Sequence, residues 1–372
     1  MPQLPPARDG EVLTIKGRDV AFSFFPVRFR ARGWTLSDTV FAVSPWAVMQ
    51  GTVDDRLDGE AHEEATAFLS QARDFYVTAS ERLSANPLLF YYAFLNLGKA
   101  LLRVRGLEAS LDHAHHGLGV RNLSDAGSTP EAAAVRVRDG KDRVHVFPEL
   151  FGLIEDHRFA DGHELPVDDL LSQVVVGHRQ WRDASDREER FIVVTDAELL
   201  HDRTSQSLWV RLFIDPQDLS RYELSVQRVV REGRLDGFFR HVRSPVPGRE
   251  CLELIQVAEY STDPADGLAP LVSRARPALW RIASALPGGA YRRYYLHLTP
   301  AGVERATQLS ALWALWFYFG SVVRYRPHSF DRLLAGRFGA YITEFVAAQP
   351  EQLLYLLASE LCQREVAKPA IA

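Results

Sequence analysis

The sequence predicts an α+β protein, with N- and C-terminal helices packed together and a central mixed or antiparallel sheet region. Apolar residues at helical spacing dominate both ends of the chain, whereas alternating apolar and polar residues, typical of strands, lie in the middle. We therefore expect three regions. They are 1–106, an N-terminal segment with an apolar helical hairpin; 107–298, a mixed α/β region; and 299–372, a three-helix segment that packs on the N-terminal helices.

The helical hairpin follows a segment, residues 1–58, whose Pro, Gly and Asp favour irregular structure with one or two strands. Helical periodicity then extends over residues 61–83. Asn86 suits an N-cap and Pro87 a first helical position, because proline has no N–H to leave unbonded there. A second helix is thus predicted from Pro87 to about Val104, followed by an ordered loop or short turns.

The central region predicts strands separated by short helices. VRVRDGKDRVHVF, residues 135–147, alternates on both sides of an Asp-Gly pair, which predicts a hairpin. Further strands are expected within 189–200, 207–215, 251–260 and 290–299, and helices within 166–181, 218–233 and 268–286. The C-terminal helices are expected over 299–325, 329–349 and 350–366, the first of them capped by Thr299 and Pro300.

Composition excludes several classes of protein. The 372 residues are 47% hydrophobic and 24% charged, with a net charge of −5, so nothing attracts the whole chain to nucleic acid or anionic membrane. Cys251 and Cys362 lie far apart, and neither has a Cys-x-x-Cys or Cys/His ligand spacing, so a disulfide framework and a zinc module are not expected. No signal peptide is evident, and the longest apolar run, Leu309 to Val323, is shorter than the roughly 20 residues that span a bilayer. A cytoplasmic protein without a membrane partner is expected.

The predicted helix NPLLFYYAFLNLGKALLRVRG carries four polar side chains at steps of four, three and four residues, which places them on one face. This polar face consists of Tyr92, Asn96, Lys99 and Arg103. The other faces are apolar, so the helix should be buried and the polar face must find partners. Of the 43 Lys and Arg residues only four are lysines, which makes Lys99 an unusual choice in an apolar setting. The lysine either forms a structural ion pair or serves an anion-binding or proton-transfer site.

At these residues the sequence resembles the YaaC-like proteins of bacteria. The resemblance rests on QARDFYVTASERLSANPLLFYYAFLNLGKALL, on the following HHGLG turn and on the C-terminal VVRYRPHSFDRLL. The residues that match the family pattern are Asn96, Lys99, His116, Gly117, Arg324, Tyr325 and Pro327. The resemblance implies a bacterial origin and a common site for these residues, but no particular reaction.

The leading hypothesis is a site for an anionic ligand, a nucleotide or a nucleic-acid segment, near the PLLFYYAFLNLGK helix and the HHGLG turn. The expected ligand-binding residues are the polar face together with Arg324 and Tyr325. His116 is the candidate general acid or base, because the unperturbed pKa of histidine is near neutrality. No cofactor is expected.

Two alternatives belong to other classes. One is a non-catalytic interaction protein or oligomeric scaffold, for instance a homo-oligomer, in which the polar face is structural. The other is a HEPN-like ribonuclease or a phosphate-hydrolysing enzyme. The Arg-x4–6-His spacing of HEPN ribonucleases occurs here about as often as chance predicts, and so does not favour that enzyme.

A metal site in DHAHHG, residues 112–117, is not expected, because adjacent ligands rarely reach one ion and no second cluster follows. An open concavity at Lys99 would favour the ligand site, and a closed ion pair with a carboxylate would favour the structural alternative.

Overall fold

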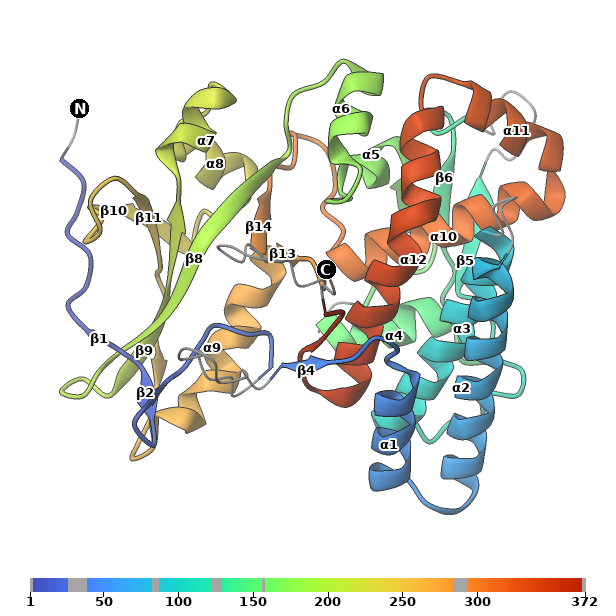
Figure 1. The fold of residues 1–372 in the computed structure, drawn as a ribbon, viewed down its shortest axis with the longest axis horizontal. Coiled ribbons are helices and arrows are strands. Elements are labelled where there is room, and N and C mark those ends of the chain that lie inside the picture. Colours follow the sequence, from blue (N-terminus) through green and yellow to red (C-terminus); the bar gives the residue numbers. More distant parts are fainter. Residues whose placement is uncertain are drawn as a thin grey trace. The chain divides into compact units, whose positions relative to one another are not determined.

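The computed structural model describes residues 3–25, 39–81, 87–121, 129–155, 158–283 and 294–369. The chain divides into two compact units (Figure 1). The first unit comprises Met1–Phe41, Glu188–Val303 and Pro369–Ala372, and the second comprises Ala42–Arg187 and Glu304–Lys368. The predicted α+β class is confirmed, with the helices from both ends of the chain in one unit and a large antiparallel sheet in the other.

The second unit is mainly helical. Its helices are α1 (Trp46–Arg56), α2 (Gly59–Ser80), α3 (Pro87–Val104), α4 (Val146–Glu155), α5 (Val167–Ser172), α6 (His178–Ser185), α10 (Gln308–Tyr325), α11 (Pro327–Ala335) and α12 (Gly339–Cys362). Strands β5 (Leu118–Arg121), β6 (Ala134–Val137) and β7 (Glu164–Pro166) form a small antiparallel sheet, and β15 (Val366–Ala367) follows α12.

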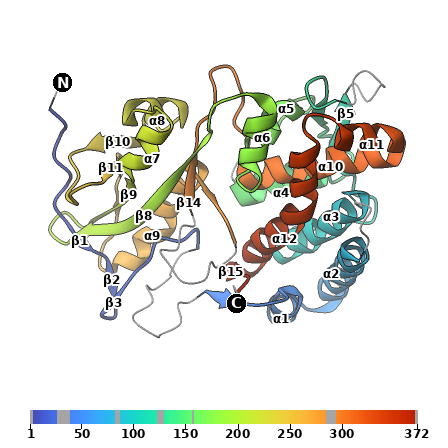
Figure 2. The ribbon, with the colours of Figure 1, turned by 45° about the horizontal axis from the view of Figure 1, so that its top comes forward.

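Helix α3 lies between the N-terminal and C-terminal helices, as predicted for this apolar segment. It packs along α2 and against α10 and α12 (Figure 2). Aromatic rings fill the contact: Phe90 and Phe94 of α3 lie 5.3 and 5.9 Å from Trp316 of α10, whose ring is 5.0 Å from Phe345 of α12. Burial of such large apolar side chains is the main force that holds these helices together.

The first unit is built on an antiparallel sheet of eight strands among its described residues. The strand order is β10 (Phe239–Val242), β11 (Glu250–Leu254), β9 (Ser207–Ile214), β8 (Phe191–Asp202), β14 (Tyr294–His297) and β13 (Leu279–Arg281), with β1 (Glu11–Val12) paired to β8 and β12 (Ala258–Glu259) to β9. Short strands β2 (Thr14–Ile15), β3 (Arg18–Asp19) and β4 (Val40–Phe41), helices α7 (Pro216–Arg221), α8 (Val226–Glu232) and α9 (Leu268–Ala275), and single turns at Pro264–Gly267 and Arg276–Ala278 complete the unit.

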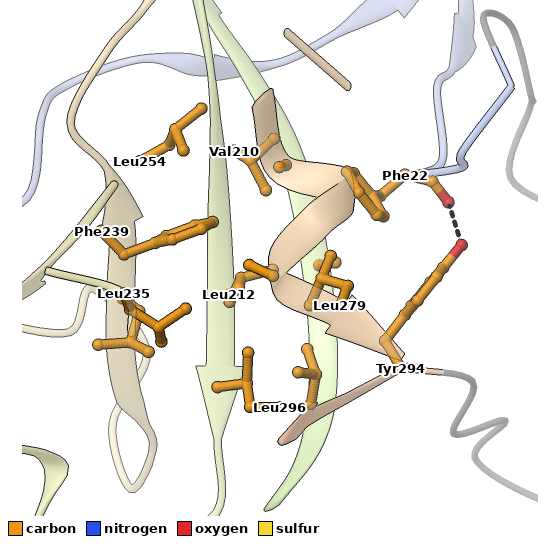
Figure 3. Close-up of a cluster of buried hydrophobic side chains, with 14 of the residues drawn as sticks. Phe22, Val210, Leu212, Leu235, Phe239, Leu254, Leu279, Tyr294 and Leu296 are labelled. Atoms are coloured by element: carbon orange, nitrogen blue, oxygen red, sulfur yellow. Dashed lines mark hydrogen bonds between the residues drawn. The ribbon is translucent and has the colours of Figure 1, made fainter. Parts of the chain in front are cut away.

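One face of this sheet carries the apolar core. Figure 3 shows side chains from several strands pointing toward one another, among them Leu212, Leu279 and Leu296. Tyr294 closes one side of the cluster, where its hydroxyl donates a 3.2 Å hydrogen bond to the carbonyl oxygen of Phe22. The alternating pattern of the strands thus places one apolar face against α9.

The opposite face carries a buried charge cluster beneath the N-terminal segment. The Glu253 carboxylate on β11 is fully buried and accepts hydrogen bonds from Arg211 on β9 at 3.2 Å and Arg240 on β10 at 2.9 Å. The backbone N–H of Arg8 donates to the same carboxylate at 3.1 Å, and the Arg8 guanidinium bonds the carbonyl oxygens of Leu254 and Ile255. The cluster therefore fastens the N-terminal segment to the sheet.

Several predicted elements were wrong in detail. The predicted hairpin at 135–147 does not form, because β6 pairs with the distant strands β5 and β7 and the chain enters α4 at Val146. Helix α1 lies in a segment predicted as irregular. The end of the helix predicted over 268–286 contains strand β13 instead. The predicted N-cap Asn86 lies outside the described residues.

The C-terminal helices also begin and end at other residues than predicted. Helix α10 begins at Gln308, because Thr307 and Ser310 form a reciprocal capping box that Thr299 and Pro300 do not provide. The helix predicted over 329–349 is divided between α11, which ends at Ala335, and α12, which begins at Gly339. The helix predicted to begin at Pro350 is the continuation of α12, with Pro350 in its interior. Among the described residues, none of the helices has the length and apolar character required to cross a membrane.

Candidate functional site

The polar face lies on a helix that is otherwise buried. Helix α3 matches the predicted Pro87 to Val104, and 13 of its residues are buried, including Asn96 at 8% exposed. The Asn96 side-chain amide makes no hydrogen bond to the residues that the structure describes. Tyr92 and Lys99 are half-buried, so this face meets the surface along one edge. A polar group in this position costs free energy unless a partner or a ligand satisfies it.

Arg103, the last member of the polar face, has a structural partner. Its Nε atom forms an ion pair with Glu64 of α2, and its guanidinium also donates to the carbonyl oxygen of Leu107. The side chains of Arg103 and Glu64 are 10% and 20% exposed. Arg103 thus joins α3 to α2 through its Nε atom and bonds the backbone through Nη1, which gives it a structural role.

Lys99 differs from Arg103 in its surroundings. Its Nζ atom lies 4.9 Å from the ring centre of Phe68 on α2, a cation–π contact. Within the described part of the chain no carboxylate lies within the 4.0 Å of an ion pair. Burial lowers the pKa of Lys99, while the charges of Glu64 and Asp112 act in the opposite direction. The charged lysine is therefore only partly compensated.

Lys99→Met should leave the free energy of unfolding unchanged or raise it. Methionine keeps the length and apolar stem of the side chain, and the lowered pKa means that the fold disfavours the charge. Urea denaturation at pH 7 measures the effect, with Lys368→Met as control, because Lys368 forms a 2.6 Å ion pair with Glu351. A loss of about 3 to 5 kcal/mol in Lys99→Met would instead identify one half of a buried ion pair.

His116 lies in the turn before β5 and contacts α3 through Tyr91. The Tyr91 hydroxyl and His116 Nδ1 are 2.9 Å apart, and their rings stack at 5.4 Å. Burial raises the pKa of the Tyr91 phenol, which keeps its proton. Burial also lowers the pKa of His116, and the positive charges of Arg324 and Lys99 lower it further. The imidazole is thus neutral at pH 7 and lies close to two cations.

Arg324 connects the end of α10 to the polar face. Its Nη1 atom donates a 2.8 Å hydrogen bond to the hydroxyl of Tyr92. Its guanidinium also lies 5.1 Å from the ring centre of Tyr325, a side chain that is 59% exposed. Pro327 begins α11 directly after this turn. The Arg-Tyr segment therefore presents one cation and one aromatic ring at the surface beside α3.

These contacts bring segments from three parts of the sequence together. Tyr92 lies between Arg324 and His116, with ring centres of Tyr92 and His116 6.1 Å apart. Tyr91 was not among the predicted site residues, because its position in α3 is one of the apolar ones. Phe68 was not among them either, because its helical periodicity indicated only a core position. We refer to Tyr92, Asn96, Lys99, His116, Arg324 and Tyr325 as the α3 site.

The histidines near this site have separate partners. His115 Nε2 lies 3.0 Å from Arg143, whereas His116 Nδ1 faces Tyr91. No group of three or more His, Cys, Asp or Glu side chains with metal-binding geometry occurs among the residues described. The α3 site is thus characterised by cations, an amide and aromatic rings.

Comparison with known proteins identifies the family. No curated protein and no solved structure matches the chain. The family model of the YaaC-like proteins matches residues 36–361, a range that includes every residue of the α3 site. The chain therefore belongs to the YaaC-like protein family.

Proposed function

We propose that the α3 site binds an anionic ligand, either a nucleotide or a segment of single-stranded nucleic acid. The observation that carries the proposal is the charge arrangement. Lys99 and Arg324 both lower the pKa of His116, and neither has an ion-pair partner among the described residues. Neighbouring positive groups without a counter-ion attract an anion, which would be bound by charge-assisted hydrogen bonds.

The aromatic side chains support a ligand that contains a base. Tyr325 is exposed beside Arg324, and Tyr92 lies beside His116. Bases stack on exposed aromatic rings and on guanidinium planes, while cations contact the phosphates. Asn96, whose amide has both donor and acceptor atoms, would orient the ligand.

His116 would act as a general acid or base if the protein is an enzyme. Its Nδ1 atom is held by Tyr91, so Nε2 is the nitrogen left to face a ligand. A bound anion would raise the lowered pKa of His116, because a nearby negative charge favours the imidazolium. The His116 ring would then take up a proton when the anion binds. A general acid must carry such a proton before it can transfer it to the ligand.

Titration of the protein with nucleotides and a single-stranded RNA oligonucleotide tests this proposal. We expect Lys99→Met and Arg324→Gln each to weaken binding about tenfold, since a hydrogen bond to a charged group contributes about 1.5–3 kcal/mol. Calorimetry measures affinity, and chromatography of the same samples detects any product. His116→Ala should lower the rate of product formation about 100-fold or more, while its affinity for the ligand should stay within a few-fold of wild type.

Arg332→Gln is the matched control, because Arg332 is an exposed arginine of α11 in the same unit. This variant makes the same charge change as Arg324→Gln and should bind as wild type. If both arginine variants lost affinity equally, the loss would be due to the change in net charge. That result would contradict the proposed site. Absence of binding across the panel would favour the non-catalytic interaction or scaffold protein.

A further inference from the structure

The first unit contains a second concentration of positive charge, in a pocket of about 500 Å³. Small-molecule sites in proteins commonly have volumes of roughly 300–1,000 Å³. The pocket lies beside the end of α8 and the segment that follows β14. Its lining consists of Glu188, Arg190, Arg228, Arg231, Glu232, Arg234, Thr299, Pro300 and Ala301.

The charges of this pocket are unbalanced toward positive. Glu232, 17% exposed, is approached by three guanidinium groups: Arg228 Nε at 2.7 Å, Arg231 at 3.7 Å and Arg190 at 3.8 Å. A single carboxylate is thus shared among three guanidinium groups. Arg228 also pairs with Glu188, whose side chain is 62% exposed and therefore weakly held. The four arginines exceed the two glutamates, and a phosphate could displace Glu188.

Arg234 follows the C-cap residue of α8, a position at which glycine is the most common residue. Its φ of +50° is left-handed, and its backbone N–H bonds the carbonyl oxygen of Arg231 to close α8. The Arg234 side chain donates to the carbonyl oxygen of Val303, beside the pocket. A residue held in a disfavoured backbone conformation is a reason to look for a functional role of its side chain.

We propose that this pocket binds a small phosphate-bearing molecule. Guanidinium groups recognise phosphate through pairs of parallel hydrogen bonds, and the pocket supplies several in a small volume. Pro300 and Ala301 form an apolar side against which the organic part of the ligand would lie. The volume of the pocket suits a compact ligand, and the excess of arginines over glutamates in its lining favours a ligand with two or more negative charges. This site belongs to the first unit and is independent of the α3 site in the second.

Calorimetric titration with inorganic pyrophosphate at low salt tests the proposal. The titrations use the full-length Lys99→Met/Arg324→Gln double variant, so that the α3 site does not contribute. We expect one saturable site per chain. Arg231→Gln and Arg234→Gly should each weaken binding about tenfold, as loss of a charge-assisted hydrogen bond does. Arg234→Gly suits this purpose because glycine readily adopts the left-handed conformation, so the fold should persist.

Glu188→Gln provides the decisive arm, because misfolding cannot produce its expected effect. Removal of the competing carboxylate should free the Nη2 atom of Arg228, whose Nε atom stays paired with Glu232, and should strengthen pyrophosphate binding about threefold or more. Arg221→Gln is the matched control: Arg221 is a 60% exposed arginine on α7 that pairs with Asp218 and does not line the pocket. It should bind as the parent does. The proposal would be overturned if pyrophosphate showed no saturable binding, or if Glu188→Gln or Arg234→Gly left the affinity unchanged. It would also be overturned if Arg221→Gln lost as much affinity as the pocket variants.

Discussion

Glu253→Ala should lower the free energy of unfolding by about 3–5 kcal/mol, as removal of one partner from a buried ion pair typically does. The Glu253 side chain is 0% exposed, and it accepts from Arg211 and Arg240 and from the backbone N–H of Arg8. Without the carboxylate, Arg211, only 6% exposed, keeps Glu198 at 3.9 Å as its remaining acidic neighbour. The charge of Arg211 would then be poorly compensated at a position where burial lowers the effective dielectric constant.

Urea denaturation of the wild type and variant measures this loss. Glu11→Ala is the matched control, because Glu11 and Arg203 form an ion pair in which both side chains are more than 70% exposed. Exposed pairs contribute about 0–1 kcal/mol, so the control should differ little from wild type. If Glu253→Ala were as stable as Glu11→Ala, water or a rearranged arginine would be compensating the cluster. The N-terminal segment should also become more accessible to protease in Glu253→Ala, since Arg8 loses an acceptor.

Local sequence signals predicted individual elements well where they agreed with the packing. The segment from Pro87 to Val104 combines proline at its start with apolar residues on most faces, and α3 has these bounds. The predicted hairpin at 135–147, in contrast, does not form. Alternation identifies a strand but not its partner, and β6 found partners in β5 and β7, which are separated from it by longer segments.

For the candidate site, too, the sequence predicted what depends on one helix but not the contacts between distant segments. Helical geometry alone places Tyr92, Asn96 and Lys99 on one face. The contacts of this face depend on the folded chain: Arg324 is 232 residues from Tyr92, and no spacing rule connects them. Tyr91 was missed because an apolar helical position ordinarily indicates core packing, whereas here its hydroxyl also holds His116.

Close packing beneath the α3 site should reverse the usual stabilising effect of a glycine-to-alanine substitution in a helix. Gly98→Ala in α3 should destabilise the protein by about 1–3 kcal/mol, although alanine normally stabilises a helix interior by about 0.5–1 kcal/mol relative to glycine. A Cβ atom at Gly98 would lie 2.5 Å from Trp313 of α10 and 3.3 Å from Leu150 of α4. Trp313 is fully buried and stacks edge-on against Phe151 at 5.9 Å, which leaves its ring little room to move.

Gly51→Ala in α1 is the matched control, because no atom lies within 4 Å of a Cβ built at Gly51. The same substitution there should raise the free energy of unfolding by about 0.5–1 kcal/mol. Urea denaturation of both variants thus separates propensity from packing. If Gly98→Ala were stabilised as much as Gly51→Ala, the contact between α3 and α10 would have to be loose. Such a contact could not hold Arg324, at the end of α10, in a fixed position against Tyr92 of α3.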